Sequence, residues 1–460
     1  MDRLLSRLES LLGPGQVLSG PAVRERATSW FDPSPMGGEA IVRPADTQQV
    51  AAVLRLCHEA GQPVVVHGGR TGGAQGQHVR DGELVLSTER MNRVLEIDTE
   101  DGVAVVEAGC VLERLHGAAQ ARGLHFPLDL GARGSCTVGG NIATNAGGVT
   151  VLRYGMMREV TLGLEAVLAD GTVLSSLNRL VKNNSGYDLK QLFIGSEGTL
   201  GVVTRAVVRL IDDPGTAATA MVATASFAEV AALLTRLRRA LGPALHSFEY
   251  MDRAYYAGVT GPGANRAPLD RGQECYVVVE AVARGEGEAS ARLAEALTDA
   301  LEEGAIEDAI LAQSSREREA IWAVREGFEP LLRDRPCFLY DVSLPIRHMA
   351  AYQREVKRAV AERFSGARCY ALAHVGDNNL HWFISPREEG EGVHEAVSRC
   401  VYAPLPAMHG SVSAEHGIGF EKKAWLGLTR SAEELETMRR LKQALDPKGI
   451  LAPGRIFDAA

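Results

Sequence analysis

Two short segments in the second half of the chain gather side chains that could bind a metal and move a proton. The first places His374 and His381 seven residues apart across a turn, and the second brings Glu415 and His416 next to each other. Two imidazoles and one carboxylate form a common ligand set for a divalent cation that keeps positions open for a substrate. An imidazole can also take up a proton near neutral pH. From the residues alone, histidines spaced in this way are more often structural, so both interpretations stay open.

Three glycine-rich turns in the first half could bring the backbone close to a flat or charged molecule. They are Gly68–Gly73, the longer stretch Asp129–Gly148, and Gly195–Gly201. Without a Cβ, glycine lets backbone N–H groups approach a phosphate or the polar edge of a ring. The first turn lacks the pattern G-x-x-x-x-G-K-[ST] and also lacks G-x-G-x-x-G before a helix. On its own it could be an ordinary tight turn, but three such turns in one part of the chain indicate a binding loop.

The elements that position these residues are expected from the periodicity of apolar residues. In the first half we predict helices over residues 46–58 and 111–121 and a hairpin of two strands over 160–173. We also predict strands over 40–44, 62–67, 83–88, 94–98, 102–109 and 202–210. In the second half we predict strands over 216–225, 247–252 and 274–283, and helices over 227–241 and 286–303. Strands that alternate with helices and return as an antiparallel sheet are typical of an α+β domain.

The composition excludes several classes of protein. The chain has 460 residues, of which 45% are hydrophobic and 23% charged, as in a folded protein of two or three domains. A net charge of −9 argues against nucleic acid or an anionic membrane surface as a partner. The seven cysteines include no C-x-x-C pair, and the N-terminal segment lacks the apolar core of a signal peptide. We therefore expect reduced thiols, no transmembrane segment and a cytoplasmic location.

The three glycine-rich segments together resemble the FAD-binding domain of the vanillyl-alcohol-oxidase-type flavoproteins. The sequences that carry the resemblance are VHGGRTGG, DLGARGSCTVGGNIATNAGG and GYDLKQLFIGSEGTLGVVT. The most similar branch is that of the D-2-hydroxyacid dehydrogenases, which includes the D-2-hydroxyglutarate and D-lactate dehydrogenases. The resemblance implies an α+β fold with three parts: a two-subdomain FAD-binding domain over residues 1–212, an α+β substrate (cap) domain with an antiparallel sheet over 213–405, and a C-terminal segment, 406–460, that packs back on the FAD domain.

The resemblance also implies which residues bind the cofactor. The first turn and the long stretch would surround the pyrophosphate of FAD, and Gly195–Val202 would lie beside the flavin. Arg70 stands where some relatives carry a histidine that is joined covalently to the flavin, so we expect FAD to be bound non-covalently. The cofactor-binding residues implied are Gly68, Gly69, Arg70, Thr71, Gly72, Gly134, Ser135, Gly139, Gly140, Asn141, Thr144, Asn145, Gly147, Glu197, Gly198 and Val202.

For the second half, the resemblance assigns a metal site and two catalytic residues. The metal ligands implied are His374, His381 and Glu415, with zinc as the expected divalent metal. His416 matches the histidine that faces the substrate hydroxyl, and it would act as the general base. Arg325 matches the residue that binds the substrate carboxylate, for which a guanidinium is suited because it can bind both oxygens. As a bare sequence feature, Arg325 would more often be an exposed charge on a helix.

Three positions depart from the pattern of the resembling family. Asn378 stands where glycine is usual, and asparagine tolerates a positive φ better than most residues. Leu339 replaces a basic residue that relatives acting on 2-hydroxyglutarate tend to carry, and Phe383 replaces a common asparagine. The last two changes favour a monocarboxylate with an apolar tail, because a buried unpaired carboxylate is costly. A lysine from elsewhere, Lys422 or Lys423, could still supply the missing charge.

We therefore expect an enzyme that depends on FAD and a divalent metal and that oxidises a small D-2-hydroxy acid to the 2-oxo acid. The hydride would go to flavin N5, and the electrons to a separate acceptor such as an electron-transfer flavoprotein or a quinone. A homodimer is considered as the assembly. Two alternatives stay open: a D-2-hydroxyglutarate dehydrogenase specifically, and a non-catalytic flavin-binding or electron-transfer module.

Overall fold

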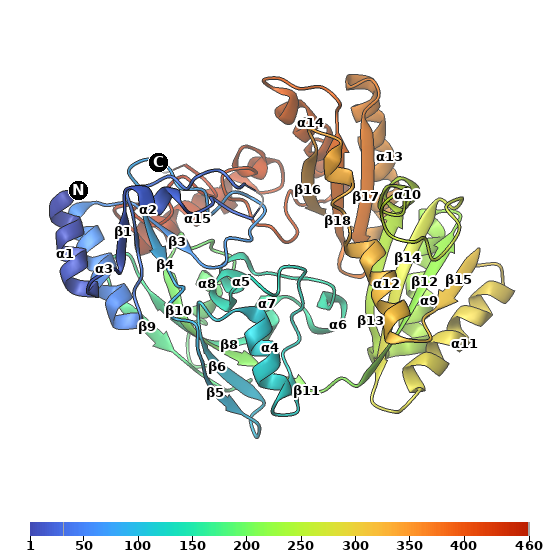
Figure 1. Cartoon of the computed structure of the whole chain (residues 1–460), viewed down its shortest axis with the longest axis horizontal. Coiled ribbons are helices and arrows are strands. Elements are labelled where there is room, and N and C mark those ends of the chain that lie inside the picture. The colour runs from blue at the N-terminus through green and yellow to red at the C-terminus, as the bar shows by residue number, and fades with distance from the viewer. Residues whose placement is uncertain (31, 459–460) are drawn as a thin grey trace. The chain divides into compact units, whose positions relative to one another are not determined.

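Residues 1–30 and 32–458 are described by the computed structural model of the chain, which divides into two units (Figure 1). Unit 1 comprises Met1–Gly148, Tyr154–Asp213 and the chain from Glu415 onward, and unit 2 comprises Val149–Arg153 and Pro214–Ala414. The predicted domain ranges include Phe31, Ala459 and Ala460, which lie outside the described residues. The assignment of those ranges to cofactor and substrate binding stays a prediction.

The first sheet of unit 1 has four strands in the order β1-β2-β4-β3. These strands are β1 (Val17–Ser19), β2 (Ala40–Val42), β3 (Val64–His67) and β4 (Leu84–Ser87). β4 is parallel to both of its neighbours, and β1 is antiparallel to β2. Helix α3 (Thr47–Ala60) begins at Asp46, whose side chain accepts a hydrogen bond from Gln49 N, and it ends at Gly61 in the left-handed conformation. Helix α1 (Asp2–Leu12) packs against α3 through one face of leucines.

The second sheet of unit 1 is antiparallel, in the order β5-β6-β10-β8-β9. Its strands are β5 (Val94–Asp98), β6 (Val103–Glu107), β8 (Thr161–Val167), β9 (Val173–Ser176) and β10 (Val202–Arg209). The predicted hairpin is confirmed as β8 and β9, with Gly171 in the turn at φ 84°. One apolar core joins β6 and β10 to helices α4 (Leu112–Gln120) and α5 (Val138–Thr144).

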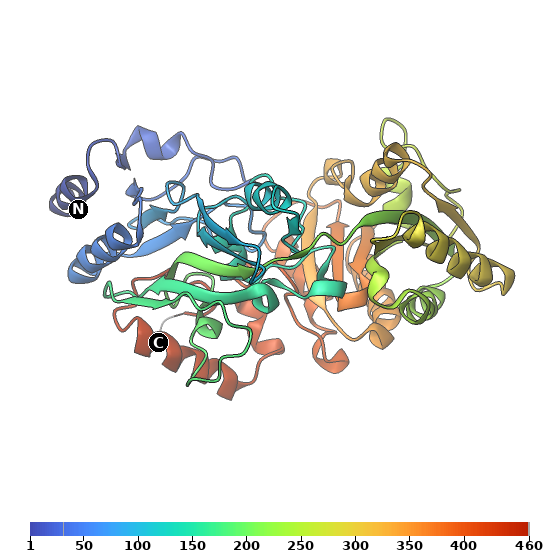
Figure 2. The same ribbon diagram turned by 90° about the horizontal axis from the view of Figure 1, so that it is seen from below.

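The end of the chain contributes to the first sheet of unit 1. Val64 N donates to Ile450 O at 2.7 Å, and Ala452 N donates to Val64 O at 2.8 Å, so the segment around Leu451 runs beside β3. Figure 2 shows the red C-terminal segment among the elements of unit 1. The smaller elements of this unit are α2 (Pro21–Arg24), β7 (Leu124–His125), α7 (Met157–Val160), α8 (Lys190–Phe193), β11 (Ile211–Asp212), the 3-10 helix η5 (Lys423–Leu428) and α15 (Ala432–Leu445); α6 (Val151–Tyr154) lies at the boundary of the units.

Unit 2 is built on one antiparallel sheet of seven strands in the order β15-β12-β14-β13-β17-β18-β16. The strands are β12 (Thr216–Thr224), β13 (Leu245–Asp252), β14 (Cys275–Ala283), β15 (Asp308–Leu311), β16 (Phe338–Ser343), β17 (Arg368–His374) and β18 (Asn379–Ser385). The helices are α9 (Phe227–Leu241), α10 (Arg253–Val259), α11 (Glu288–Glu302), α12 (Ser315–Glu326), α13 (Ile346–Arg363) and α14 (Val393–Tyr402), with 3-10 turns η1 (Gly242–Ala244), η2 (Leu331–Arg333), η3 (Val375–Asp377) and η4 (Pro406–Met408).

The two faces of this sheet carry different helices. α10 and α12 share an apolar core with the face that carries Met251, Leu372 and Phe383. On the opposite face, Tyr250 contacts Phe227 of α9 edge-on and donates a hydrogen bond to Gln353 of α13. Side chains alternate between the two faces along each strand. The helices that cover a face therefore show which residues of each strand point to it.

The strands and helices that were predicted with residue ranges are confirmed, but several other elements were not predicted, among them helix α5. α5 lies inside the glycine-rich stretch 129–148, where small residues give no apolar period, and Thr137 caps it by accepting from Gly140 N. The seven cysteines are free, as expected, although Cys337, Cys369 and Cys400 are only half-buried. Among residues 1–30 and 32–458 there is no helix with the length and hydropathy needed to cross a membrane.

Candidate functional site

The glycine-rich turns of unit 1 touch one another at their backbones. A Cβ on Gly68 would lie 2.3 Å from Thr137 Oγ1, and a Cβ on Gly69 would lie 2.1 Å from Ser135 O. A Cβ on Gly139 would lie 2.6 Å from the Cβ of Ala108. No real side chain fits at such distances, so these glycines are required for the long stretch to meet the first turn and Ala108, the residue after β6.

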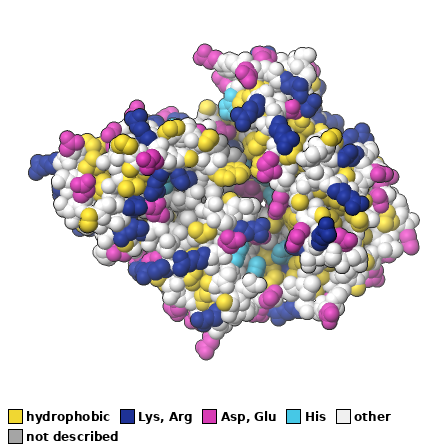
Figure 3. Space-filling view, viewed as in Figure 1, with side chains coloured by type: hydrophobic (Ala, Val, Ile, Leu, Met, Phe, Trp, Pro, Cys, Tyr) yellow, Lys and Arg dark blue, Asp and Glu magenta, His cyan; other side chains and the backbone are white. Residues whose placement is uncertain are grey.

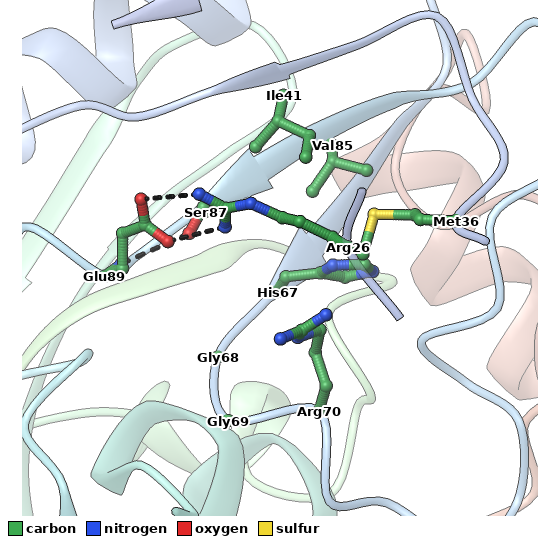
Figure 4. Close-up of a pocket in the computed structure, with 10 residues that line it drawn as sticks. All are labelled: Arg26, Met36, Ile41, His67, Gly68, Gly69, Arg70, Val85, Ser87 and Glu89. Atoms are coloured by element: carbon green, nitrogen blue, oxygen red, sulfur yellow. Dashed lines mark hydrogen bonds and ion pairs between the residues drawn. The ribbon is translucent and has the colours of Figure 1, made fainter. Parts of the chain in front are cut away.

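A cavity of about 130 Å³ opens beside the first turn (Figure 4). Its lining includes Gly68, Gly69 and Arg70, and Figure 4 shows the Arg70 guanidinium extending from the turn toward His67. The His67 ring is buried and its Nε2 lies 2.8 Å from Gln77 O. Burial lowers the pKa of His67 to about 4, despite the opposing effect of that hydrogen bond. The imidazole is therefore neutral near pH 7.

Most residues of this cavity were missed in the sequence, among them Arg26 and Glu89. Arg26 donates to Glu89 through Nη1 at 2.7 Å and Nη2 at 3.2 Å, as the dashed lines in Figure 4 show. Arg43 also pairs with Glu89, at 3.1 Å. Arg26 belongs to no motif, since it lies before the first sheet strand that the sequence predicted. The ion pairs bring it to the glycine turn only in the folded chain.

A second cavity, of about 70 Å³, lies where the turns converge, and Gly68 lines this one too. The predicted cofactor residues that line it are Gly68, Gly139, Gly140, Glu197, Gly198 and Val202. The remainder of the lining is mostly small or apolar and includes Ala108, Ala143 and Phe193. A wall of this kind, with backbone amides near the turns, fits the face of an aromatic ring system better than a fully solvated ion. The residues of unit 1 therefore fit FAD.

Other predicted cofactor residues use their side chains within the protein. Asn141 is buried and its amide lies 3.6 Å from Cys136 Sγ, while Thr144 donates to Gly140 O at 3.1 Å. Asn145 has φ 50° and accepts from Arg158 N at 2.9 Å. The remaining predicted residues, which line neither cavity, are Thr71, Gly72, Gly134, Ser135 and Gly147. Their contact with FAD stays a prediction.

Glu197 connects the third glycine turn to the segment that carries His416. Its carboxylate accepts hydrogen bonds from Ile418 N at 2.7 Å and from Gly419 N at 2.8 Å. Burial raises the pKa of Glu197, although these bonds and the charge of Lys422 oppose it. On the other side, a Cβ on Gly73 would lie 2.8 Å from His416 Nδ1. The His416 ring is thus seated against the first turn.

The candidate residues of unit 2 share one face of its sheet. Register pairs Glu249 with His374 and Asp341 with His381. His381 also lies opposite Leu372, which is two residues before His374, so the two histidines point to the same face. Their rings are 5.3 Å apart and nearly perpendicular. The sequence predicted this pair, and the fold brings it together.

Arg325 reaches this face from the end of α12. Its Nη2 lies 2.8 Å from Glu249 Oε2 and 3.4 Å from His374 Nε2, and Tyr255 Oη donates to the Arg325 carbonyl. Its side chain is 8% exposed, so it is not the solvated helix charge that the bare sequence would suggest. The Nε of Arg325 is buried and has no hydrogen-bond partner among the described residues. A buried guanidinium with an unsatisfied N–H can accept a carboxylate ligand.

Glu249 was not predicted, yet it holds both neighbours. Its Oε1 lies 2.8 Å from His374 Nδ1, and its Oε2 forms the ion pair with Arg325. Burial alone would raise the pKa of Glu249, but the charges and hydrogen bonds of His374 and Arg325 outweigh it and lower the pKa. Burial raises the pKa of nearby Asp377 to about 6. A carboxylate behind a histidine fixes the orientation of the ring, and the other nitrogen of His374 lies next to Arg325.

Asp341 lies beside His381 and also contacts the last residue of unit 2. Its Oδ1 lies 4.0 Å from His381 Nδ1, and its Oδ2 accepts from Ala414 N at 3.1 Å. Ala414 is the last residue of unit 2, and Glu415 follows it directly in the chain. Asn378 has φ 75°, which confirms that its position needs a left-handed backbone. Two imidazoles with carboxylates behind them are a donor set that fits a divalent cation.

The surface of the protein carries charges of both signs. On the face shown in Figure 3, basic and acidic side chains are interspersed over the molecule. Many exposed arginines pair with nearby acids, for example Arg358 with Glu355 and Glu362. A continuous basic surface, as phosphate backbones require, is not seen on that face.

Comparison with solved structures defines the fold class. p-Cresol methylhydroxylase with substrate bound has a TM-score of 0.79, with 16% identity over 99% of this chain and 97% of that one. Alkyldihydroxyacetonephosphate synthase has a TM-score of 0.76, with 17% identity over 98% of this chain and 84% of that one. 4-Ethylphenol oxidase from Gulosibacter chungangensis has a TM-score of 0.75, with 20% identity over 99% and 97%. The predicted fold, an α+β two-domain FAD-binding fold of the vanillyl-alcohol-oxidase type, is confirmed.

Comparison with known sequences then defines the family. The family described as FAD binding domain matches residues 38–176, and FAD linked oxidases, C-terminal domain, matches residues 213–456. The mitochondrial D-2-hydroxyglutarate dehydrogenase of Bos taurus is 40% identical over 98% of this chain and 83% of its own length. D-2-hydroxyglutarate dehydrogenase of Xanthomonas citri pv. viticola is 38% identical over 94% and 91%. The chain belongs to the D-2-hydroxyglutarate dehydrogenase family of FAD-linked oxidases, and the prediction of an FAD-dependent oxidoreductase is confirmed.

Proposed function

We propose that this enzyme oxidises a D-2-hydroxy acid to the 2-oxo acid, with FAD as the hydride acceptor. The observation that carries the proposal is the buried guanidinium of Arg325, whose Nε has no partner among the described residues and which lies beside His374. A 2-hydroxy acid offers the carboxylate that such a group binds and the hydroxyl that a nearby imidazole can deprotonate. The names of the relatives from Bos taurus and Xanthomonas support a substrate of this class.

Arg325 would hold the substrate by its carboxylate. Glu249 keeps the guanidinium in place from behind, through the ion pair at 2.8 Å, and burial strengthens the interaction with an incoming anion. Because the carboxylate does not change charge during the reaction, Arg325 would bind ground state and transition state alike. Its role is therefore to fix the position of the Cα atom.

His416 would take the hydroxyl proton. Oxidation at Cα requires this proton to leave as the hydride departs, and an imidazole is suited to accept it near pH 7. The contact of its ring with Gly73 and the hold of Glu197 on residues 418 and 419 restrict its motion. When bound, FAD supplies the acceptor for the hydride through N5.

His374, His381 and Glu415 would hold a divalent cation, for which zinc is proposed. Glu249 orients His374, and Asp341 anchors Ala414 directly before Glu415. Asp341, which was not predicted, is a further carboxylate beside His381. A cation at these residues would stabilise the negative charge that develops on the hydroxyl oxygen.

Unit 1 would hold FAD without a covalent bond, since Arg70 occupies the position at which attachment was considered. The residues proposed to contact FAD are the sixteen named from the sequence, with Arg26 added. The electron acceptor is proposed to be an electron-transfer flavoprotein or a quinone. A homodimer and a cytoplasmic location stay predictions; the relative from Bos taurus is named as mitochondrial.

Anaerobic titration of the purified holoenzyme tests the proposal. A D-2-hydroxy acid should bleach the flavin absorbance, and the matching L-acid should not. If no D-2-hydroxy acid reduces the flavin, the proposal is wrong, and the result supports the alternative of a non-catalytic flavin-binding module. Acid precipitation should release the flavin into the supernatant, whereas yellow precipitated protein would contradict non-covalent binding. In the variant Arg325→Leu, which lacks the proposed carboxylate-binding group, the flavin should stay bound, but millimolar substrate should no longer bleach it.

A further inference from the structure

The sheet face of unit 2 becomes apolar one row beyond the candidate site. Register pairs Asp341 with His381, and two residues before and after these it pairs Leu339 with Phe383. Residues two apart along a strand point to the same face, so Leu339 and Phe383 lie next to the candidate site on its own side of the sheet. Tyr370 stands opposite Phe383 on the other neighbouring strand. The row is thus Leu339, Phe383 and Tyr370.

Further apolar side chains extend this row toward α12. The Phe328 ring lies 5.3 Å from the Phe383 ring, and the Tyr255 ring lies 6.2 Å from it. Phe328, Leu332 and Leu339 are half-buried against the core that contains Phe383. Part of their apolar surface therefore remains able to contact a ligand at this face. Apolar walls with one fixed charged group are typical of small-molecule sites.

The charged groups around this row do not favour the binding of a second carboxylate of the substrate. Burial raises the pKa of Tyr255; the positive charge of Arg325, the proposed partner of the first carboxylate, opposes this, and the carboxylates of Glu329 and Glu326 add to it. Beside Tyr370, Asp334 pairs with two cations, Arg368 at 2.7 Å and Arg387 at 3.0 Å. Tyr370 donates to the same aspartate at 3.0 Å.

The two lysines considered from the sequence are also engaged, within unit 1. Lys423 Nζ lies 2.5 Å from Asp458. Lys422 is buried, and its charge acts on Glu197 and Glu421. Neither lysine is required to compensate a substrate charge.

We infer that the substrate of this enzyme carries an apolar, uncharged side chain, which lies against Leu339 and Phe383. The inference rests on the proposed function and deepens it: the substrate is a D-2-hydroxy monocarboxylic acid. A distal carboxylate placed on this row would lose its water without gaining a cation, which is costly. The chain thereby differs from relatives that are named for D-2-hydroxyglutarate.

A matched pair of substrates tests the inference. D-2-hydroxyvalerate and D-2-hydroxyglutarate have the same five-carbon chain and differ in a terminal methyl or carboxylate. Flavin reduction is measured anaerobically by stopped flow with the holoenzyme, and kcat/KM for hydroxyvalerate should be higher by roughly 10² or more. Equal or faster reduction by hydroxyglutarate overturns the inference and leaves the proposed function intact. If neither acid reduces the flavin, the proposed function itself fails, and the inference with it.

Two variants locate the contact. Leu339→Lys should improve hydroxyglutarate at least 10-fold relative to hydroxyvalerate, because it adds a cation to the row. Phe338→Lys is the matched control, since residue 338 points to the opposite face of the same strand, where its ring lies 4.7 Å from His394. If both lysines give the same change, the row is not the contact. Should either lysine prevent folding, Leu339→Ala is used: it should slow hydroxyvalerate about 10-fold more than D-lactate, which has no tail to reach residue 339.

Discussion

The two units build their candidate sites from opposite materials. In unit 1 the glycine turns bring backbone to the cavity walls, and the essential feature is the absence of side chains at Gly68, Gly69 and Gly139. In unit 2 the site is a set of charged side chains, Glu249, Arg325 and His374, held on a flat sheet face. Backbone groups suit a large cofactor that must be bound at many points. Side chains suit a reaction that needs a charge at one point.

This difference predicts separate consequences of mutation. A change in the side-chain set should remove turnover and leave the flavin in place. A change in the glycine turns should remove the flavin. The two readouts, flavin content and rate of flavin reduction, therefore test the comparison directly.

The largest effect is expected for His416→Ala. If His416 takes the hydroxyl proton, the rate of flavin reduction in stopped flow should fall by about 10² to 10⁴, with flavin and metal content unchanged. Glu415→Gln, His374→Ala and His381→Ala should instead lose the metal, because too few ligands remain to hold it. Removal of the metal with a chelator should stop turnover and leave the flavin bound. Reduction of the flavin by the His416 variant at the wild-type rate would assign the base to another residue.

A smaller effect is expected for Glu249→Gln. The amide keeps the shape of the side chain but removes its negative charge and leaves one acceptor oxygen in place of two, so it cannot accept from both Arg325 and His374. We expect KM to rise by about 10- to 100-fold, with a smaller fall in kcat, since Arg325 would bind substrate before and during the reaction.

Glu280→Gln is the matched control for that variant. Glu280 is also buried on this sheet and pairs with Arg318 of the same helix, α12, but it contacts no candidate residue. Both variants should lose stability, and only the Glu249 variant should change KM. An unchanged KM for Glu249→Gln would mean that the ion pair is purely structural.

Gly69→Ala tests the backbone half of the comparison. The new Cβ would meet Ser135 O at 2.1 Å and Cys136 Cα at 2.9 Å, so the first turn and the long stretch must move apart. We expect a loss of about 1–3 kcal/mol, the usual range for overpacking, and less flavin per protein by absorbance. Gly117→Ala, in exposed α4 with nothing within 4 Å, should instead stabilise the protein slightly. Full flavin content in the Gly69 variant would contradict a rigid backbone site.

The smallest effect is expected from His67. Its pKa in the folded chain is about 4, below the ordinary value of 6.5, so acid protonates the unfolded chain first. This cost is absent above pH 6.5 and grows as the pH falls toward 4, reaching about 2 kcal/mol at pH 5. His67→Gln should therefore lose less stability than the wild type between pH 7.5 and 5, measured by urea unfolding. If the free energies of unfolding of the wild type and the variant change with pH in parallel, burial of the neutral His67 ring does not lower the stability in acid.

The same comparison explains what the sequence could predict. Each glycine turn is one continuous segment of the sequence, so its pattern could be recognised and indicated the FAD domain. The structure has Gly68, Gly69, Gly139 and Gly140 at the cavity walls. The pairing of His374 with His381 could also be predicted, because one turn joins their two strands.

Glu249 and Asp341 could not be predicted, because neither belongs to a motif. Each is an acidic residue in a strand, and its partners are far away in the sequence. Only the strand order, in which β13 pairs with β17 and β16 with β18, brings them to the histidines. Helix α5 escaped notice for another reason: a cap and tertiary contacts, rather than apolar period, define it.

The route of the chain through the two units has a consequence for its synthesis. The chain leaves unit 1 at Asp213 and returns at Glu415, so the residues beside β3 and the Arg455 side chain that pairs with Glu83 are made only after unit 2. At about 5–20 residues per second, the ribosome needs roughly 10–40 s to make the intervening unit. Unit 2 can thus complete its fold while unit 1 still lacks its final strand partner. On this schedule the first sheet of unit 1 gains the segment beside β3 only after unit 2 has been made.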